Sequence, residues 1–378
     1  MKTADRVARV PPSGIRRFFE LAEEADDVIS LGVGEPDFAA PWAAREAGIT
    51  SLELGRTSYT ANRGRRELRE RIETKLSEYD LSYSADDEVL VTTGVSEAVD
   101  LAMRALVDPG DVVAVPEPSY VSYRPAVSFV DGRVLPVPTS MEDGFRLSYD
   151  VLRDAGAEDA DYLVTCYPNN PTGAVMEEDD LREVADFARE HDVVVLSDEV
   201  YADLTYEGEH VSPASLAGMR ERTVVFNGFS KAYAMTGTRL GYAAGPAEAI
   251  RAMNRVHQYT MLSAPTTAQY MAIEALDRCD DDVAEMRKQF DRRRRYVLSR
   301  LDEMDVDCFR AAGAFYVFPE CPRGSSEEFA EALLEEEGVA VVPGGVFGDA
   351  GEGHLRMSYA TAMPQLKEAL SRIESFLG

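Results

Sequence analysis

One lysine of this chain stands where an amine can become reactive. Lys231 follows a short β-branched run, 223–225, with Ser230 directly before it and Arg239 eight positions after it. A lysine that leaves the end of a strand can face a cleft, where desolvation lowers its pKa and frees the amine to attack a carbonyl. We therefore interpret Lys231 as the candidate Schiff-base residue. The other lysines of the chain are interpreted as surface charges: Lys2, Lys75, Lys288 and Lys367.

Clusters of glycine, hydroxyl, amide and acidic residues follow other short β-branched runs. The clusters are 92–96, 116–120, 168–173, 197–201 and, with the lysine, 228–231. The runs are 89–91, 112–115, 134–137, 162–165, 193–196, 223–225 and 240–244, and helical periodicity appears at 97–107, 178–190 and 247–256. Such alternation is typical of a mainly parallel sheet covered by helices on both faces. Because ligands bind at the carboxyl ends of strands in such sheets, we expect the five clusters to line one cleft.

These clusters contain the groups that a cofactor with an aldehyde, a phosphate and a pyridine ring requires. Lys231 supplies the amine, and Asp198 can keep the ring nitrogen protonated so that the ring accepts electrons. A phosphate requires donors at a helix N-terminus and a cation. The candidates for this role are Gly94, Val95, Ser96, Ser230 and Arg239. Tyr120 is the best placed aromatic residue to stack on the ring.

Several motifs extend this pattern to nearly the whole chain. They are Leu31–Phe38, Tyr59, Asn170–Gly173, Asp198–Tyr201, Ser230–Lys231 with Arg239, and Arg356 followed by Ser358. In these motifs the chain resembles the class I and II aminotransferases of fold type I, the pyridoxal-phosphate enzymes related to aspartate aminotransferase. The resemblance implies an α/β fold with a large domain, built on a mainly parallel seven-stranded sheet covered by helices, and a smaller α+β domain. We expect residues 1–42 to join the small domain, 43–274 to form the large cofactor-binding domain and 275–378 to form the small C-terminal domain.

The resemblance also implies roles for individual residues. Lys231 is expected to carry the cofactor and to move the proton between the substrate α-carbon and C4′ of the cofactor. Asn170 and Tyr201 are expected to hydrogen-bond the 3-oxygen of the cofactor. Arg356 is expected to bind the substrate α-carboxylate through two parallel bonds, with help from Gly34 and Asn170. Tyr59 is expected to reach the phosphate in the neighbouring subunit, which makes a homodimer the smallest working unit.

Two positions depart from the pattern of relatives. Many relatives carry a serine three positions before the lysine, where this chain has Gly228, so one phosphate hydroxyl is lost or replaced. Some aspartate-specific bacterial relatives carry a lysine where this chain has Ser96. The chain therefore lacks this indication of a dicarboxylate substrate. Arg16 or Arg17 could instead bind a side-chain carboxylate, or both could be surface charges. We rank aspartate slightly ahead of aromatic or broad aliphatic substrates.

Composition limits the possible partners. The 378 residues carry a net charge of −29, which opposes binding to nucleic acid or to an anionic membrane. Few lysines among abundant acidic residues are typical of a protein from a high-salt, halophilic cytoplasm. No apolar run approaches the length of a bilayer span and the start has no signal-peptide core, so we expect a cytoplasmic protein. The four cysteines show no paired spacing and are expected to be reduced.

Other suggestive features have simpler interpretations. The basic run Arg292–Arg295 is interpreted as a solvated helix face paired with nearby acids. The four histidines show no metal-ligand spacing, and we expect no metal site. The glycine-rich stretch Gly348–Gly353 follows no βαβ unit, which argues against a nucleotide-binding loop.

The leading hypothesis is an aminotransferase that moves an amino group from an L-amino acid to a 2-oxo acid, with 2-oxoglutarate as the expected acceptor, by a ping-pong cycle. Two alternatives stay open at this stage. One is a pyridoxal-phosphate-dependent β-lyase or decarboxylase of the same fold, because the same carbanion can react in several ways. The other is a regulatory protein that keeps a cofactor site without catalysis.

Overall fold

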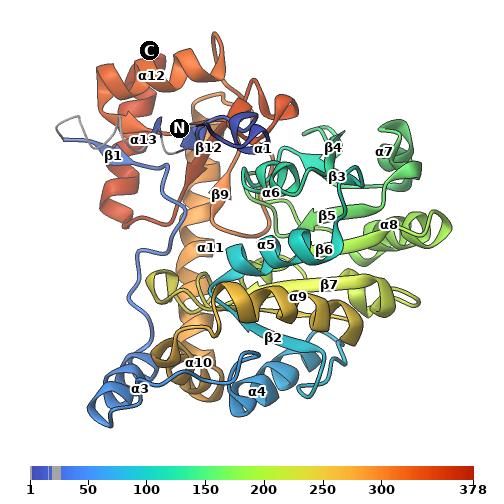
Figure 1. Cartoon of the computed structure of the whole chain (residues 1–378). Helices are drawn as coiled ribbons and strands as arrows, with labels where there is room; N and C mark the ends of the chain where they lie inside the picture. Colours follow the sequence, from blue (N-terminus) through green and yellow to red (C-terminus); the bar gives the residue numbers. More distant parts are fainter. Residues whose placement is uncertain (1, 16, 19–26) are drawn as a thin grey trace.

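The largest element of the fold is a seven-stranded sheet. The computed structural model describes residues 2–15, 17–18 and 27–378 (Figure 1). The sheet contains β2 (Val89–Thr92), β3 (Val112–Glu117), β4 (Arg133–Pro138), β5 (Tyr162–Cys166), β6 (Val194–Asp198), β7 (Thr223–Gly228) and β8 (Gly241–Ala244), in the order β2-β8-β7-β6-β5-β3-β4. Only β8 runs antiparallel to its neighbours. The predicted seven-stranded, mainly parallel sheet is confirmed, and the run 240–244 is its antiparallel strand.

Helices cover both faces of this sheet because its side chains alternate between two cores. In β2, Leu90 packs in the core that contains residues of α5 (Val95–Leu106) and α9 (Ala247–Thr260). Its neighbours Val89 and Val91 pack on the opposite face, in the core that contains residues of α4 (Arg66–Ser77) and α10 (Thr266–Arg278). The inner strands are therefore buried on both sides, as their continuous apolar sequence predicts, whereas the edge strand β4 is largely exposed or half-buried.

The remaining helices complete the two lobes. They are α1 (Asp5–Ala8), α3 (Trp42–Glu53), α6 (Tyr123–Phe129), α7 (Tyr149–Asp154), α8 (Glu178–Glu190), α11 (Asp280–Glu303), α12 (Ser326–Glu337) and α13 (Met363–Leu377). Helices α8 and α12 begin with reciprocal capping boxes at Glu177 and Ser325, which fixes their first residues where the sequence places them. The sequence also predicts a helix over 15–25, of which residues 16 and 19–25 lie outside the described residues.

The N-terminal and C-terminal parts of the chain meet in the smaller lobe. Strand β1 (Ile29–Ser30) pairs in parallel with β10 (Val339–Ala340). A second small sheet is antiparallel, in the order β11 (Val342–Pro343), β12 (Leu355–Ser358) and β9 (Tyr316–Val317). Helix α11 runs from α10 in the large lobe to this lobe (Figure 1). The β1–β10 pair supports our proposal that residues 1–42 belong with 275–378, beside a large domain of 43–274.

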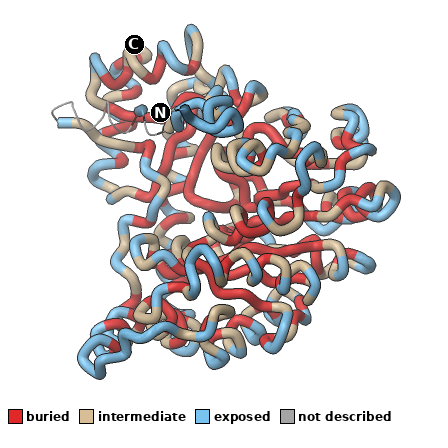
Figure 2. The backbone as a smooth tube through the Cα atoms, in the orientation of Figure 1, coloured by how far each residue is buried: buried red, intermediate tan, exposed pale blue. Residues whose placement is uncertain are grey.

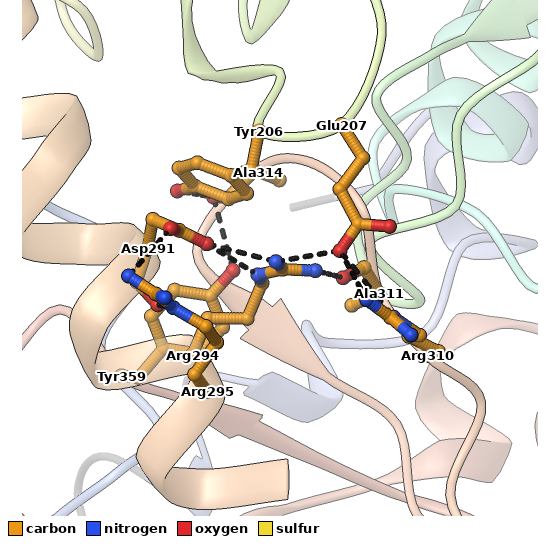
Figure 3. A network of polar contacts seen from close by, with 9 residues as sticks. All are labelled: Tyr206, Glu207, Asp291, Arg294, Arg295, Arg310, Ala311, Ala314 and Tyr359. Atoms are coloured by element: carbon orange, nitrogen blue, oxygen red, sulfur yellow. Dashed lines mark hydrogen bonds and ion pairs between the residues drawn. The ribbon is translucent and has the colours of Figure 1, made fainter.

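The basic run on α11 is not the solvated face that the sequence predicts. Arg292 and Arg295 are exposed, but Arg293 and Arg294 are buried. Arg294 donates to Glu207 at 2.7 Å and to the carbonyl of Ala311 at 2.6 Å, between Asp291 and Glu207 (Figure 3). These two arginines lie on the same side of the helix as the buried residues Met286, Phe290, Val297 and Leu301. The prediction is wrong for them because α11 crosses between the lobes and is covered on that side.

Lys75 also differs from its predicted place on the surface. Its side chain is only 13% exposed, and its Nζ lies 2.8 Å from both Asp203 and Glu78. This pairing neutralises Lys75 within the large lobe, so it is a structural cation. The interpretation of Lys75 as a surface charge is therefore wrong.

Burial follows the layers of the fold. Figure 2 shows the strands of the large sheet as mostly buried, with exposed segments on the outer helices. Within the part of the chain that the structure describes, no helix is both long enough and apolar enough to cross a membrane. The four cysteines are free, two of them buried.

Candidate active site

The clusters predicted to share a cleft do so. A cleft of about 1450 Å³ opens at the carboxyl edge of the large sheet and reaches the smaller lobe. Eleven of the predicted site residues line it: Gly34, Val95, Ser96, Tyr120, Asn170, Asp198, Tyr201, Ser230, Lys231, Arg239 and Arg356. They come from the ends of β2, β3, β5, β6 and β7, from β12 and from the N-terminal segment. The topology therefore brings together residues that are spread over more than 300 positions.

Lys231 lies in this cleft three residues after β7. Its Nζ donates a hydrogen bond to the carbonyl oxygen of Gly34 at 2.6 Å and lies 5.6 Å from the ring centroid of Tyr201. Burial, together with the positive charge of Arg356, lowers the pKa of Lys231 to about 8. A substantial fraction of the amine is therefore unprotonated slightly above neutral pH, as a nucleophile requires.

Asp198 is the last residue of β6 and is buried in the wall of the cleft that also contains Lys231. The hydroxyl of Tyr123 donates to its Oδ2 at 2.7 Å, and the N–H of Val200 donates to its Oδ1 at 3.2 Å. Burial raises the pKa of Asp198 to about 6, against the opposing effect of these two bonds. The carboxylate is thus ionised at neutral pH but lacks a cationic partner within hydrogen-bond distance among the described residues, which suits it to a protonated ring nitrogen.

Arg356 on β12 forms the other end of the cleft. Its Nη1 donates to Oδ1 of Asn170 at 3.0 Å and its Nη2 donates to the carbonyl of Gly32 at 2.6 Å. Its guanidinium lies between the rings of Tyr316 and Phe347, at 4.6 and 5.0 Å from their centroids. Its Nε is buried without a hydrogen bond, and no described carboxylate pairs with it. A buried guanidinium in this state can accept a substrate carboxylate as its counter-ion.

Tyr201 contacts a residue to which the sequence assigned no role. Its hydroxyl lies 2.9 Å from the hydroxyl of Tyr316, which comes from β9 in the smaller lobe. A Cβ on Gly34 would lie only 2.6 Å from the same Tyr316 hydroxyl, so Gly34 has no room for a side chain. The N-terminal segment can therefore bring its backbone close to Lys231 only because this position is glycine.

A second group of residues, which we call the phosphate cradle, comprises Gly94, Val95, Ser96, Ser230 and Arg239. Gly94 precedes α5 with a φ of 78°, and its missing Cβ would lie 2.5 Å from Nη2 of Arg239. Because Val95 and Ser96 begin the helix, their N–H groups have no acceptor within it. N–H donors, two hydroxyls and a guanidinium at one helix N-terminus fit a phosphate group.

Gly228, where many relatives carry serine, sits at a close approach of two strands. A Cβ at this position would lie 2.8 Å from Cα of Gly241 and 3.0 Å from the carbonyl oxygen of Leu240. Gly228 and Gly241 are also register partners in the β7–β8 pair. A serine here would have to push the two strands apart, so this position has no room for a side-chain hydroxyl.

The remaining predicted residues lie elsewhere. Tyr59 is 80% exposed and does not line the cleft. Arg17 bonds to Glu327 and, at 2.7 Å, to Glu331 on α12, so it does not serve the cleft as a reader of side-chain carboxylates. Arg16 lies outside the described residues.

Two tyrosines at the site were missed from the sequence. Tyr123 holds Asp198, and Tyr316 touches both Tyr201 and Arg356. Tyr123 follows the predicted stacking residue Tyr120 by three positions, a spacing that places both near one strand end. Tyr316 stands in an apolar run that gives no sign of a polar role, so only the fold reveals it.

The fold and the cleft define the class of protein: an α/β enzyme with a buried lysine at the carboxyl edge of its sheet. The sequence model of the family "Aminotransferase class I and II" matches residues 26–373. The chain belongs to this family of fold type I transferases, which use pyridoxal phosphate, and it is an aminotransferase.

Two of the similar proteins are named for different substrates, aspartate and aromatic amino acids. The chain is 44% identical to an aspartate aminotransferase of Pyrococcus abyssi over 100% of its own length and 98% of that protein. It is 42% identical to aromatic-amino-acid aminotransferase 2 of Thermococcus litoralis, with the same coverage of both chains. The solved structure of aspartate aminotransferase from Thermus thermophilus with maleate matches it with a TM-score of 0.93 and 39% identity, over 99% of each chain. The similarity therefore supports an aminotransferase of the aspartate or aromatic type.

Proposed function

We propose that this chain binds pyridoxal 5′-phosphate and transfers the amino group of an L-amino acid to a 2-oxo acid. Aspartate and aromatic amino acids are the proposed donors and 2-oxoglutarate is the proposed acceptor, in a ping-pong cycle. The observation that carries this proposal is Lys231, a buried amine with a pKa lowered to about 8, in one cleft with Asp198 and Arg356.

Each group of the cleft has a task in this reaction. When bound, pyridoxal phosphate supplies an aldehyde for the amine and a ring that withdraws electrons from the substrate α-carbon. Asp198, held by Tyr123, keeps a proton on the ring nitrogen. Lys231 moves a proton between the substrate α-carbon and C4′ of the cofactor. Tyr201 and Asn170 donate to the 3-oxygen, and Tyr120 stacks on the ring.

Substrate binding rests on the smaller lobe. Arg356 would bind the α-carboxylate through two parallel N–H groups, and its Nε–H, which has no hydrogen bond to a described residue, can be one of them beside its bonds to Asn170 and Gly32. Glycine at position 34 lets the N-terminal segment close over the same carboxylate. The residues of the phosphate cradle hold the cofactor at the opposite end of the cleft. Different residues therefore bind the substrate and the cofactor.

A panel of amino acids tests this function directly. The protein with cofactor is mixed with each L-amino acid and its absorbance is followed, with 2-oxoglutarate added afterwards. We expect aspartate or aromatic amino acids to change the spectrum and 2-oxoglutarate to restore it. Lys231→Ala should abolish turnover. Ammonia or pyruvate released without an acceptor, or full turnover in Lys231→Ala, would contradict the proposal.

We further propose a homodimer in which Tyr59 serves the neighbouring site. Tyr59 is exposed, and the same chain exposes large apolar side chains on α3 and after α9: Trp42, Ile49, Leu52, Leu54, Met261 and Leu262. Exposed apolar groups of this kind are typical of subunit interfaces.

Hybrid dimers test the exchange of Tyr59. A dimer of one Lys231→Ala chain and one Tyr59→Ala chain contains one intact site if Tyr59 crosses the interface. We expect this hybrid to regain about half of the wild-type cofactor-dependent activity per dimer. If Tyr59 served its own subunit, the hybrid would have only about half of the activity of the Tyr59→Ala homodimer, because one of its two sites lacks Lys231.

A further inference from the structure

A buried histidine on α9 is linked to the loop that precedes the phosphate cradle. His257 has no exposed side-chain surface, and its Nδ1 lies 2.7 Å from Oε1 of Glu97, which is itself only 9% exposed. The other oxygen of Glu97 accepts a hydrogen bond from the N–H of Thr93. One carboxylate therefore joins α9 to the residue that directly precedes Gly94.

The ionised state of Glu97 determines which ring nitrogen of His257 carries the proton of their hydrogen bond. Burial raises the pKa of Glu97, but the bonds from His257 and Thr93 outweigh burial and lower the pKa overall. An ionised carboxylate can only accept, so the shared proton lies on Nδ1 of His257. The other ring nitrogen, Nε2, is buried without a hydrogen bond. Among the described residues, the only polar contact of this imidazole is thus the one made by Nδ1.

The loop that this contact holds connects β2 to α5 and carries the first residues of the phosphate cradle. Gly94 adopts a φ of 78°, and its carbonyl accepts a bond from the hydroxyl of Thr92 at 3.0 Å. The N–H that Glu97 holds belongs to the peptide between Thr92 and Thr93, and the position of this peptide sets where Gly94 and the helix-start N–H groups of Val95 and Ser96 lie. Glu97 fixes this peptide only while its own carboxylate is held in place, and His257 is the side chain that holds it.

We propose that His257 is a positioning residue for the phosphate cradle, acting through Glu97 on the loop Thr93–Ser96. The proposal rests on the proposed function, in which the cradle holds the phosphate of the cofactor. The contact belongs to Nδ1 and not to Nε2, so two substitutions separate positioning from packing. The amide nitrogen of asparagine can occupy the place of Nδ1, whereas glutamine fills more of the volume but carries its amide nitrogen near the place of Nε2.

The dissociation constant of pyridoxal phosphate is the first measurement. We expect His257→Asn to stay within about threefold of wild type and His257→Gln to bind about tenfold to a hundredfold more weakly, which is the range for a lost bond to a charged group. A packing role predicts the reverse order, because asparagine leaves the larger void. The ³¹P resonance of the bound cofactor gives a second readout: it should keep its wild-type position in His257→Asn and move in His257→Gln.

Two further variants complete the test. His191→Gln is the matched control, because His191 ends α8 and does not line the cleft; it should leave both the affinity and the ³¹P resonance unchanged. Glu97→Ala removes the link at its centre and should weaken cofactor binding about tenfold or more, even if a His257 variant fails to fold. Equal affinities in wild type, His257→Gln and Glu97→Ala would overturn the inference and leave the proposed function intact. A wild-type protein that binds no pyridoxal phosphate would overturn both.

Discussion

The amine of Lys231 donates to the carbonyl oxygen of Gly34 at 2.6 Å, although 197 positions separate them in sequence. Lys231 follows strand β7 of the large sheet, whereas Gly34 belongs to the segment that begins with β1 in the smaller lobe. The bond therefore joins the two lobes at the reactive amine. It is also the only hydrogen bond of Lys231 to a described residue, so the ammonium is stabilised far less than it is in water.

The cost of this buried charge predicts a pH-dependent stability. The pKa of Lys231 is about 8 in the folded protein, below its ordinary value of 10.5. Below pH 8 the folded protein must carry a charge that burial disfavours, so Lys231→Met should stabilise the cofactor-free protein at pH 7 by about 3 kcal/mol. The unfolded state binds more protons between pH 8 and 10.5, so this difference should shrink over that range and vanish above it. Urea unfolding of both proteins at several pH values measures it; a difference that does not change with pH would contradict the assignment.

The hydroxyl of Tyr123 should control the ionisation of Asp198. It donates to the carboxylate at 2.7 Å, which lowers the pKa of Asp198, whereas burial raises it. The net result is a pKa of about 6. Tyr123→Phe removes this donor and should raise the pKa of Asp198 to roughly 7 in the cofactor-free protein. A ¹³C NMR titration of the carboxyl group reports the value. An unchanged or lower pKa would show that Tyr123 does not stabilise the carboxylate.

Arg356 should govern substrate binding without affecting the cofactor. It is buried, has no described carboxylate partner and lies at the opposite end of the cleft from the phosphate cradle. Arg356→Gln should lower kcat/KM for the preferred amino acid on the order of 10²- to 10³-fold and leave cofactor affinity unchanged. Arg17→Gln is the control, because Arg17 pairs with α12, and it should change neither quantity. Loss of cofactor binding in Arg356→Gln would contradict the assignment of Arg356 to the substrate carboxylate.

The strongly acidic surface predicts a dependence on salt. A net charge of −29 on 378 residues repels itself, and this repulsion weakens as ions screen it. The melting temperature should therefore rise between 0.1 M and molar KCl. An unchanged melting temperature between the two salt concentrations would contradict the hypothesis of a high-salt protein.

The sheet could be predicted from the sequence because most of its strands are buried on both faces and are continuous apolar runs. Helix α3 (Trp42–Glu53) could not be predicted, since its pattern is inverted. It buries small residues, Ala44, Gly48 and Ser51, and Gly48 lets Met271 of α10 approach closely. Its large apolar residues, such as Trp42 and Ile49, are exposed. A helix that turns its bulky side chains outward offers no apolar stripe for sequence analysis to find.

The candidate site was predictable to the extent that its residues end strands. Asp198 and Lys231 are ionisable residues at or just after the ends of apolar strands, which makes them easy to recognise in the sequence. Tyr316 reaches the cleft from the other lobe, and nothing in the sequence indicates which lobe surfaces face each other. The buried pairs made by Arg293 with Asp37 and by His257 with Glu97 are likewise products of tertiary packing between distant helices and loops.

The central claim is that Lys231 carries the cofactor, and covalent labelling tests it most directly. The protein is incubated with pyridoxal phosphate, reduced with borohydride, digested and analysed by mass spectrometry. With only five lysines in the chain, each possible site falls on a distinct peptide. The account predicts the label on the peptide that contains Lys231, and none in Lys231→Ala. A label on Lys2, Lys75, Lys288 or Lys367, or no label at all, would contradict it.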